Sequence, residues 1–193
     1  MKDSTDPRQA AILEAAWKTF AAYGFRKTSM DDIARAAGMS RPALYQHYRN
    51  KEDIFRRLAQ VYYDEAADAV AAALAQPGSV AEQVAAAFAV QGGALIEAML
   101  TSPHGMELID SSKATAADIA VEGEARLTAI YADWLTRQAA EGRIGFDGSA
   151  GEVAATMTAV LKGIKTTVED YATYAVRVRQ IAALIGAGLA RGA

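Results

Sequence analysis

The sequence of 193 residues contains no cysteine, only four prolines and only two histidines. Without cysteine the chain has no disulfide framework, no thiolate metal site and no cysteine nucleophile, and such a composition suits a reducing cytosol. Proline, which interrupts helices, is scarce, whereas alanine, the strongest helix former, is abundant. About half of the residues are apolar, so the chain can bury a substantial core, and we expect an all-helical protein.

The signatures of several other protein classes are also missing. No apolar run approaches the roughly 18 residues that a membrane span requires. We find no nucleophile–base pair, no glycine-rich phosphate loop and no cluster of metal-binding residues. We therefore expect no enzymatic activity, no metal, no cofactor and no membrane partner.

The net charge of −3 is unevenly distributed along the chain. Residues 1–57 contain 11 Lys and Arg against 7 Asp and Glu, whereas the remaining residues contain 9 against 16. A basic N-terminal part on an acidic remainder is expected when one end of a protein meets phosphate. Random variation between the two parts is the alternative interpretation.

The stretch of residues 29–52 predicts two short helices with a tight turn between them. Ser29 and Asp32 have the spacing of a capping box, in which each residue binds the backbone of the other at a helix start. Gly38 supplies the positive φ that ends the first helix, and Ser40 is the N-cap of the second. A helix, a short glycine turn and a second helix are the layout of a helix-turn-helix.

Apolar periodicity predicts further helices along the rest of the chain, about nine in all. Their expected ranges are residues 8–23, 51–75, 79–101, 106–111, 114–140, 149–172 and 174–191. We place a domain boundary near residue 55, inside the first long helix, so that this helix belongs to both parts.

The residues around the turn closely resemble TetR-type (tetracycline-repressor-like) bacterial transcriptional regulators. The matching residues are Gly24-Phe25, Thr28-Ser29, Asp32-Ile33-Ala34, Ala37-Gly38, Ser40, Leu44-Tyr45, His47-Tyr48 and Lys51-Glu52-Asp53-Ile54. Tyr48 replaces the commoner Phe. The resemblance covers roughly the first 60 residues, and the remainder matches only in the layout of its helices.

This resemblance implies an all-α homodimer with an N-terminal three-helix DNA-binding domain, residues 1–55, and a C-terminal domain, residues 56–193. The second domain would dimerise and hold a small-molecule effector. The implied function is a cytoplasmic, ligand-responsive regulator, most often a repressor, that binds double-stranded, pseudo-palindromic operator DNA and is released by an inducer. An activator, or a helical protein-interaction module with the same head, remains the alternative.

The second helix of the motif is expected to run from Arg41 to His47 and to lie in the major groove. Arg41 can bind the O6 and N7 atoms of guanine or, equally, a phosphate, and Ala43 can contact a thymine methyl group. The resemblance assigns Tyr45, His47 and Lys51 to the sugar–phosphate backbone. The expected DNA-binding residues are Lys27, Thr28, Ser29, Arg41, Pro42, Ala43, Tyr45, Gln46, His47 and Lys51.

Two further sets of residues are expected in the C-terminal part. Large or adaptable side chains predict an effector pocket lined by Phe88, Met99, His104, Met106, Tyr131 and Trp134. Apolar stripes on the last two helices predict a two-fold dimer interface with Met157, Val160, Ile164, Val168, Val178, Ile181 and Ile185. For both sets, a purely structural role in the core of one chain is the alternative.

Overall fold

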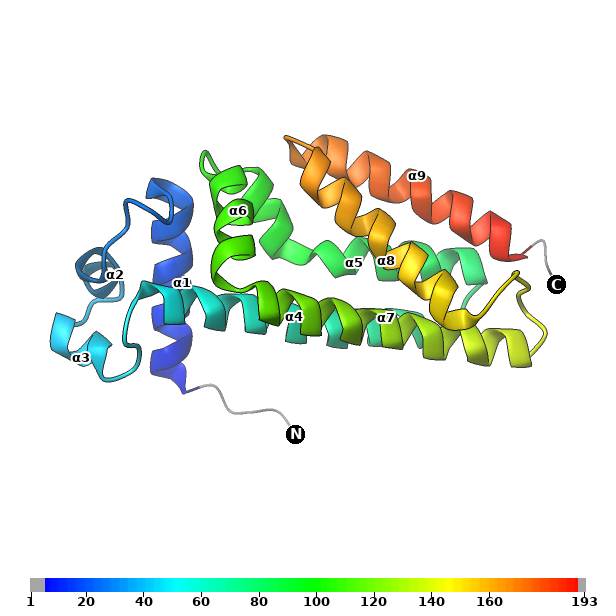
Figure 1. Cartoon of the computed structure of the whole chain (residues 1–193), viewed down its shortest axis with the longest axis horizontal. Coiled ribbons are helices and arrows are strands. Elements are labelled where there is room, and N and C mark those ends of the chain that lie inside the picture. The colour runs from blue at the N-terminus through cyan, green and yellow to red at the C-terminus, as the bar shows by residue number, and fades with distance from the viewer. Residues whose placement is uncertain (1–5, 191–193) are drawn as a thin grey trace. The chain divides into compact units, whose positions relative to one another are not determined.

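The computed structural model describes residues 6–190, except for the side chain of Ser112, and these residues form nine α-helices without a strand (Figure 1). In chain order they are α1 (Pro7–Tyr23), α2 (Met30–Ala36), α3 (Arg41–Tyr45), α4 (Lys51–Leu74), α5 (Val80–Leu100), α6 (Gly105–Thr115), α7 (Ala117–Ala140), α8 (Ala150–Thr167) and α9 (Tyr171–Ala190). The prediction of an all-α fold is confirmed.

The helix ends on either side of Val168 differ from the prediction for local reasons. The helix expected over 149–172 ends at Thr167, because Val168 has an extended backbone and its side chain is buried. The carboxylate of Asp170 then accepts hydrogen bonds from the backbone N–H of Thr173 at 2.8 Å and from its hydroxyl at 2.8 Å. Asp170 is therefore a helix-capping residue that the apolar pattern did not reveal.

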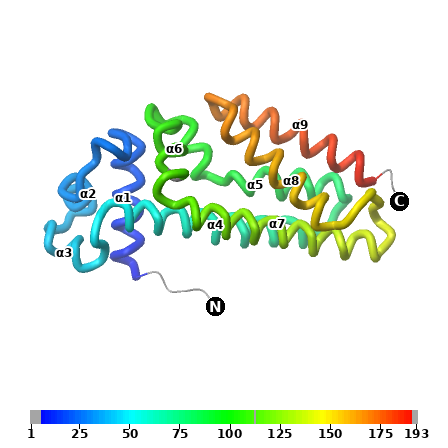
Figure 2. The backbone as a smooth tube through the Cα atoms, viewed as in Figure 1, coloured from blue at the N-terminus to red at the C-terminus, as the bar shows by residue number. Residues whose placement is uncertain are grey.

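The chain divides into two compact units, which can be followed by residue number in Figure 2. The head unit comprises the residues up to Tyr62 together with Ala98–Ala120. The body unit comprises Tyr63–Glu97 together with the residues from Val121 onward. Three helices, α4, α5 and α7, therefore contribute residues to both units. The predicted functional boundary near residue 55 stays a prediction.

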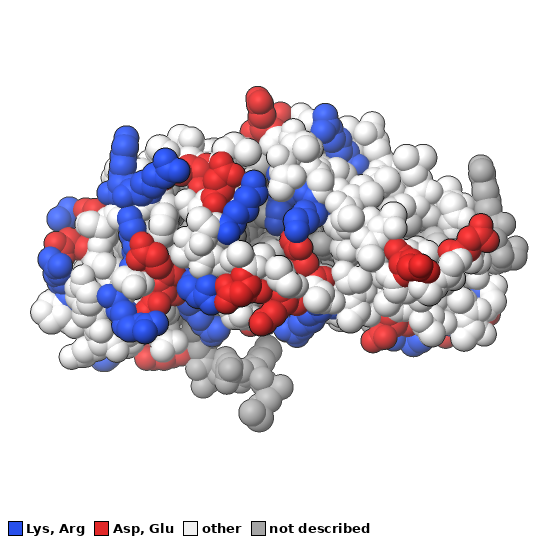
Figure 3. Space-filling model, in the orientation of Figure 1, with Lys and Arg blue, Asp and Glu red and all other residues white. Residues whose placement is uncertain are grey.

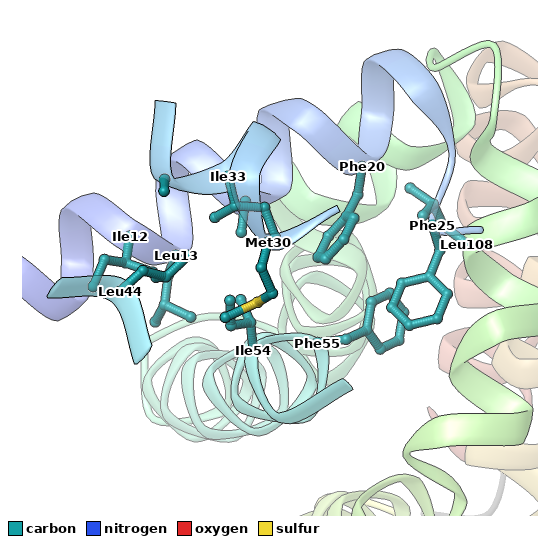
Figure 4. Packing of buried hydrophobic residues seen from close by; sticks show 12 residues of the cluster. Ile12, Leu13, Phe20, Phe25, Met30, Ile33, Leu44, Ile54, Phe55 and Leu108 are labelled. Carbon is teal, nitrogen blue, oxygen red and sulfur yellow. The ribbon is translucent and has the colours of Figure 1, made fainter. Parts of the chain in front are cut away.

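The head unit has its own apolar core, formed by α1, α2, α3, the start of α4 and α6 (Figure 4). The rings of Phe20, Phe25 and Phe55 contact one another with centroids 5.0–5.8 Å apart. Leu108 of α6 is fully buried in the same cluster. The buried members are Ile12, Leu13, Ala16, Phe20, Phe25, Met30, Ile33, Ala34, Leu44, Ile54, Phe55 and Leu108.

The body unit packs long helices closely at small residues. A Cβ atom at Gly92 of α5 would collide with the Tyr174 hydroxyl of α9, and the next residue, Gly93, interrupts α5 with φ +57°. The glycine pair thus both interrupts α5 and allows a close approach of α9. Gly123 of α7 likewise lies directly against the Tyr63 ring of α4.

Among the described residues, α5 is the one helix long and apolar enough to span a membrane by length and composition. The sequence still has no uninterrupted apolar run of that length, because Glu82, Gln83, Gln91 and Glu97 interrupt this helix. Val84, Ala87 and Phe88 of this helix are fully buried in the protein. Its apolar character is accounted for by its place in the core of the body unit, together with its interruption at Gly93.

Candidate DNA-binding surface

The start of α2 is fixed by the predicted capping box. Ser29 Oγ accepts a hydrogen bond from the Asp32 backbone N–H at 3.2 Å, and the Asp32 carboxylate accepts one from the Ser29 N–H at 3.0 Å. The Ser29 hydroxyl also donates to that carboxylate at 2.6 Å. These hydrogen bonds hold the pKa of Asp32 below its ordinary value, so the carboxylate that anchors the helix is stable in its charged form.

The turn between α2 and α3 has the predicted glycine conformation. Gly38 adopts φ +67°, and the backbone N–H of Met39 donates to the Ala34 carbonyl at 2.9 Å, which closes the end of α2. Ser40 Oγ then accepts a hydrogen bond from the Ala43 N–H at 3.3 Å and begins α3. The end of α2 and the start of α3 are thus fixed by hydrogen bonds between residues at most five positions apart.

The helix α3 is shorter than expected and ends at Tyr45 rather than His47. The N–H groups of Gln46 and His47 donate to carbonyls three residues back, those of Ala43 and Leu44, at 3.2 and 3.0 Å. Such bonds tighten the chain into a turn after the helix. Pro42 and Gln46 are exposed and Ala43 and His47 are half-buried, so this segment presents a short, accessible face.

Arg41 stands at the N-terminus of α3 with its guanidinium held by two neighbours. It forms an ion pair with Asp31 of α2 at 3.1 Å and donates to the Tyr45 hydroxyl at 3.4 Å. Its guanidinium also lies 5.4 Å from the centre of the Tyr45 ring. These contacts raise the pKa of Arg41, the Tyr45 hydrogen bond most, and they hold the cation at the exposed end of the helix.

Lys51, at the start of α4, is less available than its sequence position suggests. Its ammonium group donates to the carbonyls of Phe25 at 2.8 Å, Thr28 at 2.9 Å and Arg26 at 3.1 Å. A lysine ammonium has three hydrogen-bond donors, and all three are used here. Lys51 therefore ties the link between α1 and α2 to α4, and its predicted contact with DNA phosphate stays a prediction.

The three residues predicted before α2 differ in their exposure. Lys27 and Ser29 are exposed, whereas Thr28 is buried and its hydroxyl donates to the Gly24 carbonyl at 2.7 Å. The Thr28 side chain thus supports the link from inside the head unit. On the face shown in Figure 3, basic and acidic side chains alternate over the head unit, so no single basic patch marks the surface there.

The sequence did not reveal that the segment from Ser102 to Asp118, which includes α6, braces the head unit. The carboxylate of Glu107 accepts a hydrogen bond from the Arg26 backbone N–H at 3.0 Å and lies against Gly24. Ser102 Oγ donates to the Ala21 carbonyl at 2.6 Å, and Arg56 forms paired hydrogen bonds to Asp118 at 2.6 and 2.7 Å. These partners lie about 60 to 80 positions apart in sequence, beyond the reach of any local pattern.

The predicted pocket residues are divided between the two units. In the body unit, Phe88 and Tyr131 meet edge to face at 5.8 Å, and the Tyr131 hydroxyl donates to Gln91 at 2.8 Å. Trp134 is buried one turn further along α7. In the head unit, Met99 packs on the apolar core, His104 lies 3.4 Å from Glu107, and Met106 is exposed. Whether any of these residues lines an effector pocket stays a prediction.

The predicted interface residues also fall into two groups. Met157, Val168 and Val178 are buried within the body unit of a single chain. The others are half-buried: Val160, Ile164, Ile181 and Ile185. On the same side of α9 as Ile181, Leu184 is 70% exposed. Figure 3 shows a largely uncharged surface over this part of the body unit.

The described residues hold no group of three or more His, Asp or Glu side chains arranged to bind a metal ion. They do hold two capped short helices across a glycine turn, with an arginine at the exposed start of the second. The fold and this motif together define an all-helical protein of the helix-turn-helix class.

Comparison with known proteins gives the family. Residues 12–58 match the family model of bacterial regulatory proteins of the tetR family. The transcriptional activator FasR of Mycolicibacterium smegmatis is 36% identical over 69 residues, which cover 36% of this chain and 32% of FasR. The transcriptional repressor Rv1474c of Mycobacterium tuberculosis is 37% identical over 59 residues, 31% of this chain and 32% of that protein. The chain thus spans about a third of the length of the curated relatives it matches.

The fold is shared over almost the whole chain. A transcriptional regulator of the TetR/AcrR family from Thermobifida fusca superposes with a TM-score of 0.73, covering 95% of this chain and 98% of that one at 24% identity. Residues 12–58 are therefore similar in sequence to tetR-family regulators, and 95% of the chain shares the fold of the Thermobifida fusca protein. Its relatives are named as transcriptional regulators and not as enzymes, in agreement with the expectation from the sequence.

Proposed function

We propose that this chain is a transcriptional repressor that binds pseudo-palindromic operator DNA as a homodimer and is released by a small-molecule effector. The geometry of the head unit supports the DNA-binding part of this proposal. Its α3 is short, capped and exposed, and it presents Arg41 at its N-terminus, the end that helix-turn-helix proteins direct at base edges. Repression rather than activation is supported by the similarity to Rv1474c, which is named a repressor, whereas FasR is named an activator.

The preformed contacts of Arg41 suggest how it would act. Asp31 and Tyr45 hold its guanidinium by hydrogen bonds, so the side chain is positioned before DNA arrives. Tyr45 is itself one of the expected DNA-binding residues. In the complex, Arg41 would exchange one of these hydrogen bonds for a bidentate contact with guanine, and Tyr45 would remain as its stacking partner.

The Arg41 proposal is tested with a duplex selected from a random library, measured by fluorescence anisotropy at several salt concentrations. Wild-type binding should weaken with increasing salt, because each phosphate contact releases counterions. Arg41→Ala should weaken binding by about 1–3 kcal/mol and relax the preference at one base pair. Lys18→Ala, which removes an exposed cation paired with Glu14 on α1, is the matched control and should change little.

An equal loss of affinity for all sequences would place Arg41 on phosphate instead. Binding that shows no salt dependence, or no selected sequence at all, would contradict the proposed operator-binding function. A reporter gene placed behind the selected sequence would separate the two directions of regulation, since expression should fall when the protein is present.

We also propose that dimerisation uses the outward side of α8 and α9. The half-buried residues Ile181 and Ile185 flank exposed Leu184 on α9, and burying such residues is the usual source of affinity in homodimer interfaces. A two-fold interface would place the same residues of both chains against each other. The two head units would then contact DNA half-sites whose centres lie about one helical turn of DNA, roughly 34–36 Å, or a multiple of that distance, apart.

The dimer proposal is tested by sedimentation velocity at micromolar concentration. The wild type should sediment as a dimer, and Leu184→Glu should shift it towards monomer. Val121→Glu is the matched control, because Val121 is 66% exposed but lies on α7. A wild type that is monomeric throughout this range would contradict the proposal. An effector can release the protein from DNA only if it binds the DNA-free form more tightly than the DNA-bound form. An effector that binds both forms equally leaves the equilibrium between them unchanged.

A further inference from the structure

The side chains of Asp31 and Arg41 connect α2 to α3 across the glycine turn. The Arg41 guanidinium donates to the Asp31 carboxylate at 3.1 Å, and the two side chains are 59% (Arg41) and 50% (Asp31) exposed. Asp31 is not needed to cap α2, because the neighbouring Asp32 already accepts the hydrogen bond from the Ser29 N–H. Ion pairs between exposed side chains add little to stability, since water screens them. The stability of the fold therefore explains little of this pair.

The Asp31 carboxylate makes Arg41 a poor partner for phosphate. Its negative charge lies 3.1 Å from the guanidinium, so the net charge of the pair is close to zero. A phosphate that approached Arg41 would also approach this carboxylate, and like charges repel. A base edge, in contrast, is neutral and presents hydrogen-bond donors as well as acceptors. The pair thus favours a base over the sugar–phosphate backbone as the partner of Arg41.

The two side chains offer donors and acceptors next to each other. A guanidinium has five N–H groups, and the contacts of Arg41 with Asp31 and Tyr45 use two of them. The contact with the Tyr45 hydroxyl, at 3.4 Å, is the longer, so it is the one that a base would replace. An ionised carboxylate has about four acceptor sites, of which the contact with Arg41 uses one. Arg41 can therefore donate to one group while Asp31 accepts from the group beside it.

A guanine–cytosine pair presents the complementary pattern in the major groove. Guanine offers two acceptors, N7 and O6, and the N4 amino group of cytosine, a donor, lies next to O6. In an adenine–thymine pair the central group is the N6 amino donor of adenine, which would face the guanidinium, and thymine adds an acceptor, O4. Two donors followed by an acceptor therefore fit guanine–cytosine and not adenine–thymine.

We propose that Asp31 and Arg41 together recognise one guanine–cytosine pair: Arg41 donates to O6 and N7 of guanine, and Asp31 accepts from N4 of the paired cytosine. Asp31 is then a specificity-determining residue beyond the expected DNA-binding residues. This inference rests on the proposed operator binding and adds to it a contact with the opposite strand. The competing explanation is a local role in the first turn of α2, where acidic residues are favoured, and such a role does not depend on the base.

Modified duplexes test each contact separately, by fluorescence anisotropy with the sequence that the wild type selects from a random library. The pair contacted by Arg41 is the one at which Arg41→Ala relaxes the preference. At the cytosine position, 2-pyrimidinone still pairs with guanine but lacks the N4 amino group. At the guanine position, 7-deazaguanine lacks the N7 acceptor. The same analogues at a guanine–cytosine pair outside the half-sites control for changes in the duplex itself.

We expect 2-pyrimidinone to weaken wild-type binding about fivefold to tenfold, the loss of one hydrogen bond. This measurement requires no substitution, so it does not depend on the folding of any variant. Asp31→Ala should bind the 2-pyrimidinone and cytosine duplexes equally, because its acceptor is absent, yet 7-deazaguanine should still weaken its binding. Glu14→Ala is the matched control, because it also removes an exposed carboxylate of the head unit that is paired with a cation, Lys18. It should respond to 2-pyrimidinone as the wild type does.

Several results would overturn the proposal. They are wild-type binding that 2-pyrimidinone leaves unchanged, an Asp31→Ala variant that responds to it as the wild type does, and a pair other than guanine–cytosine at the position of Arg41. A loss in Asp31→Ala that is equal on every duplex, with the response to 2-pyrimidinone retained, would reduce Asp31 to positioning Arg41. Each of these results can occur while the wild type binds its selected sequence, so the proposed regulatory function would stand. A wild type that selects no sequence would overturn both.

Discussion

The head unit and the body unit are stabilised in different ways. In the head, α2 has seven residues and α3 has five, too few to be stable alone, and side-chain caps and carbonyl contacts hold them in place. In the body, α7, α8 and α9 have 18 to 24 residues each. They pack at small residues, including Gly123 against Tyr63 and Gly186 against Ala81.

This difference indicates which interactions fix the geometry of each unit. Short helices fixed by caps hold their position through a few identifiable hydrogen bonds, so the DNA-binding surface has a definite geometry before it meets DNA. Long helices packed at glycines depend instead on shape, and a single added methyl group can displace them. The head should therefore respond to lost hydrogen bonds and the body to added volume.

The largest effect is expected from adding volume to the body. Gly123→Ala would place a Cβ atom onto the Cβ and Cγ atoms of Tyr63, which cannot swing aside as the end of a flexible side chain would. We expect a loss of about 3 kcal/mol or more in the free energy of unfolding, at the upper end for overpacked cores, despite the better helix propensity of alanine. Denaturant unfolding followed by circular dichroism measures it.

The matched control is Gly151→Ala in the first turn of α8. A Cβ atom there meets nothing closer than Ser149 Oγ at 3.9 Å, an ordinary contact. Its stability should change by less than about 0.5 kcal/mol. Similar free energies of unfolding for the two variants would show that the body unit tolerates added volume. That result would contradict the proposed difference between the two units.

The next effect is expected from removing a hydrogen-bond donor in the head. Lys51→Met keeps much of the apolar stem but leaves the carbonyls of Phe25, Arg26 and Thr28 without their shared donor. We expect a loss of about 2 kcal/mol, typical of hydrogen bonds to a charged group. Lys18→Met, which breaks an exposed ion pair, should cost less than about 0.5 kcal/mol.

The same variant decides between two roles for Lys51. A structural tie predicts the loss of stability just described, with a salt dependence of DNA binding equal to that of the wild type. A phosphate contact, as the sequence predicts, would instead leave stability nearly unchanged and lower the salt slope by about one. Thermal unfolding and anisotropy titrations on one preparation separate these outcomes.

The sequence predicted the elements whose signals are local. The capping box of Ser29 with Asp32, the positive φ of Gly38 and the N-cap Ser40 were all expected, and they are present. These features depend on residues within four positions of one another. Apolar periodicity is also a local signal, and it predicted most ends of the long helices to within a few residues.

Contacts between distant residues could not be predicted in this way. Glu107 receives its hydrogen bond from Arg26, 81 positions away, and nothing near either residue indicates the other. The sequence left open whether Met157, Val168 and Val178 face the core or a second chain, and in the structure they are buried within one chain. Periodicity identifies the apolar face of a helix. It does not reveal whether that face packs on the core of the same chain or on a second chain. The DNA contacts themselves stay predictions.

A smaller effect should appear when the same cap is removed from each unit. Ser29 and Ser149 form equivalent capping boxes at α2 in the head and α8 in the body. Replacing either with alanine should cost about 1 kcal/mol of stability. Only Ser29→Ala should also weaken DNA binding, because α2 has seven residues and orients α3, whereas α8 has 18. Equal effects on DNA binding would show that the head does not depend on its local caps.

The smallest effect concerns pH and the Arg56–Asp118 ion pair of the head. The hydrogen bonds from Arg56 lower the pKa of Asp118 from 3.8 to about 2. A carboxylate with a lowered pKa stabilises the folded state fully above its unfolded value and loses this contribution as the pH falls through its folded value. The head should therefore lose stability between about pH 4 and pH 2, a window set by the same pair.

Asp118→Asn should flatten this acid dependence, measured by amide hydrogen exchange of head residues from pH 6 down to pH 2. Asp133→Asn on α7, an exposed residue without an ion pair among the described residues, should leave it unchanged. An identical acid profile for wild type and Asp118→Asn would mean that this surface pair adds nothing and that the head relies on its caps and core alone.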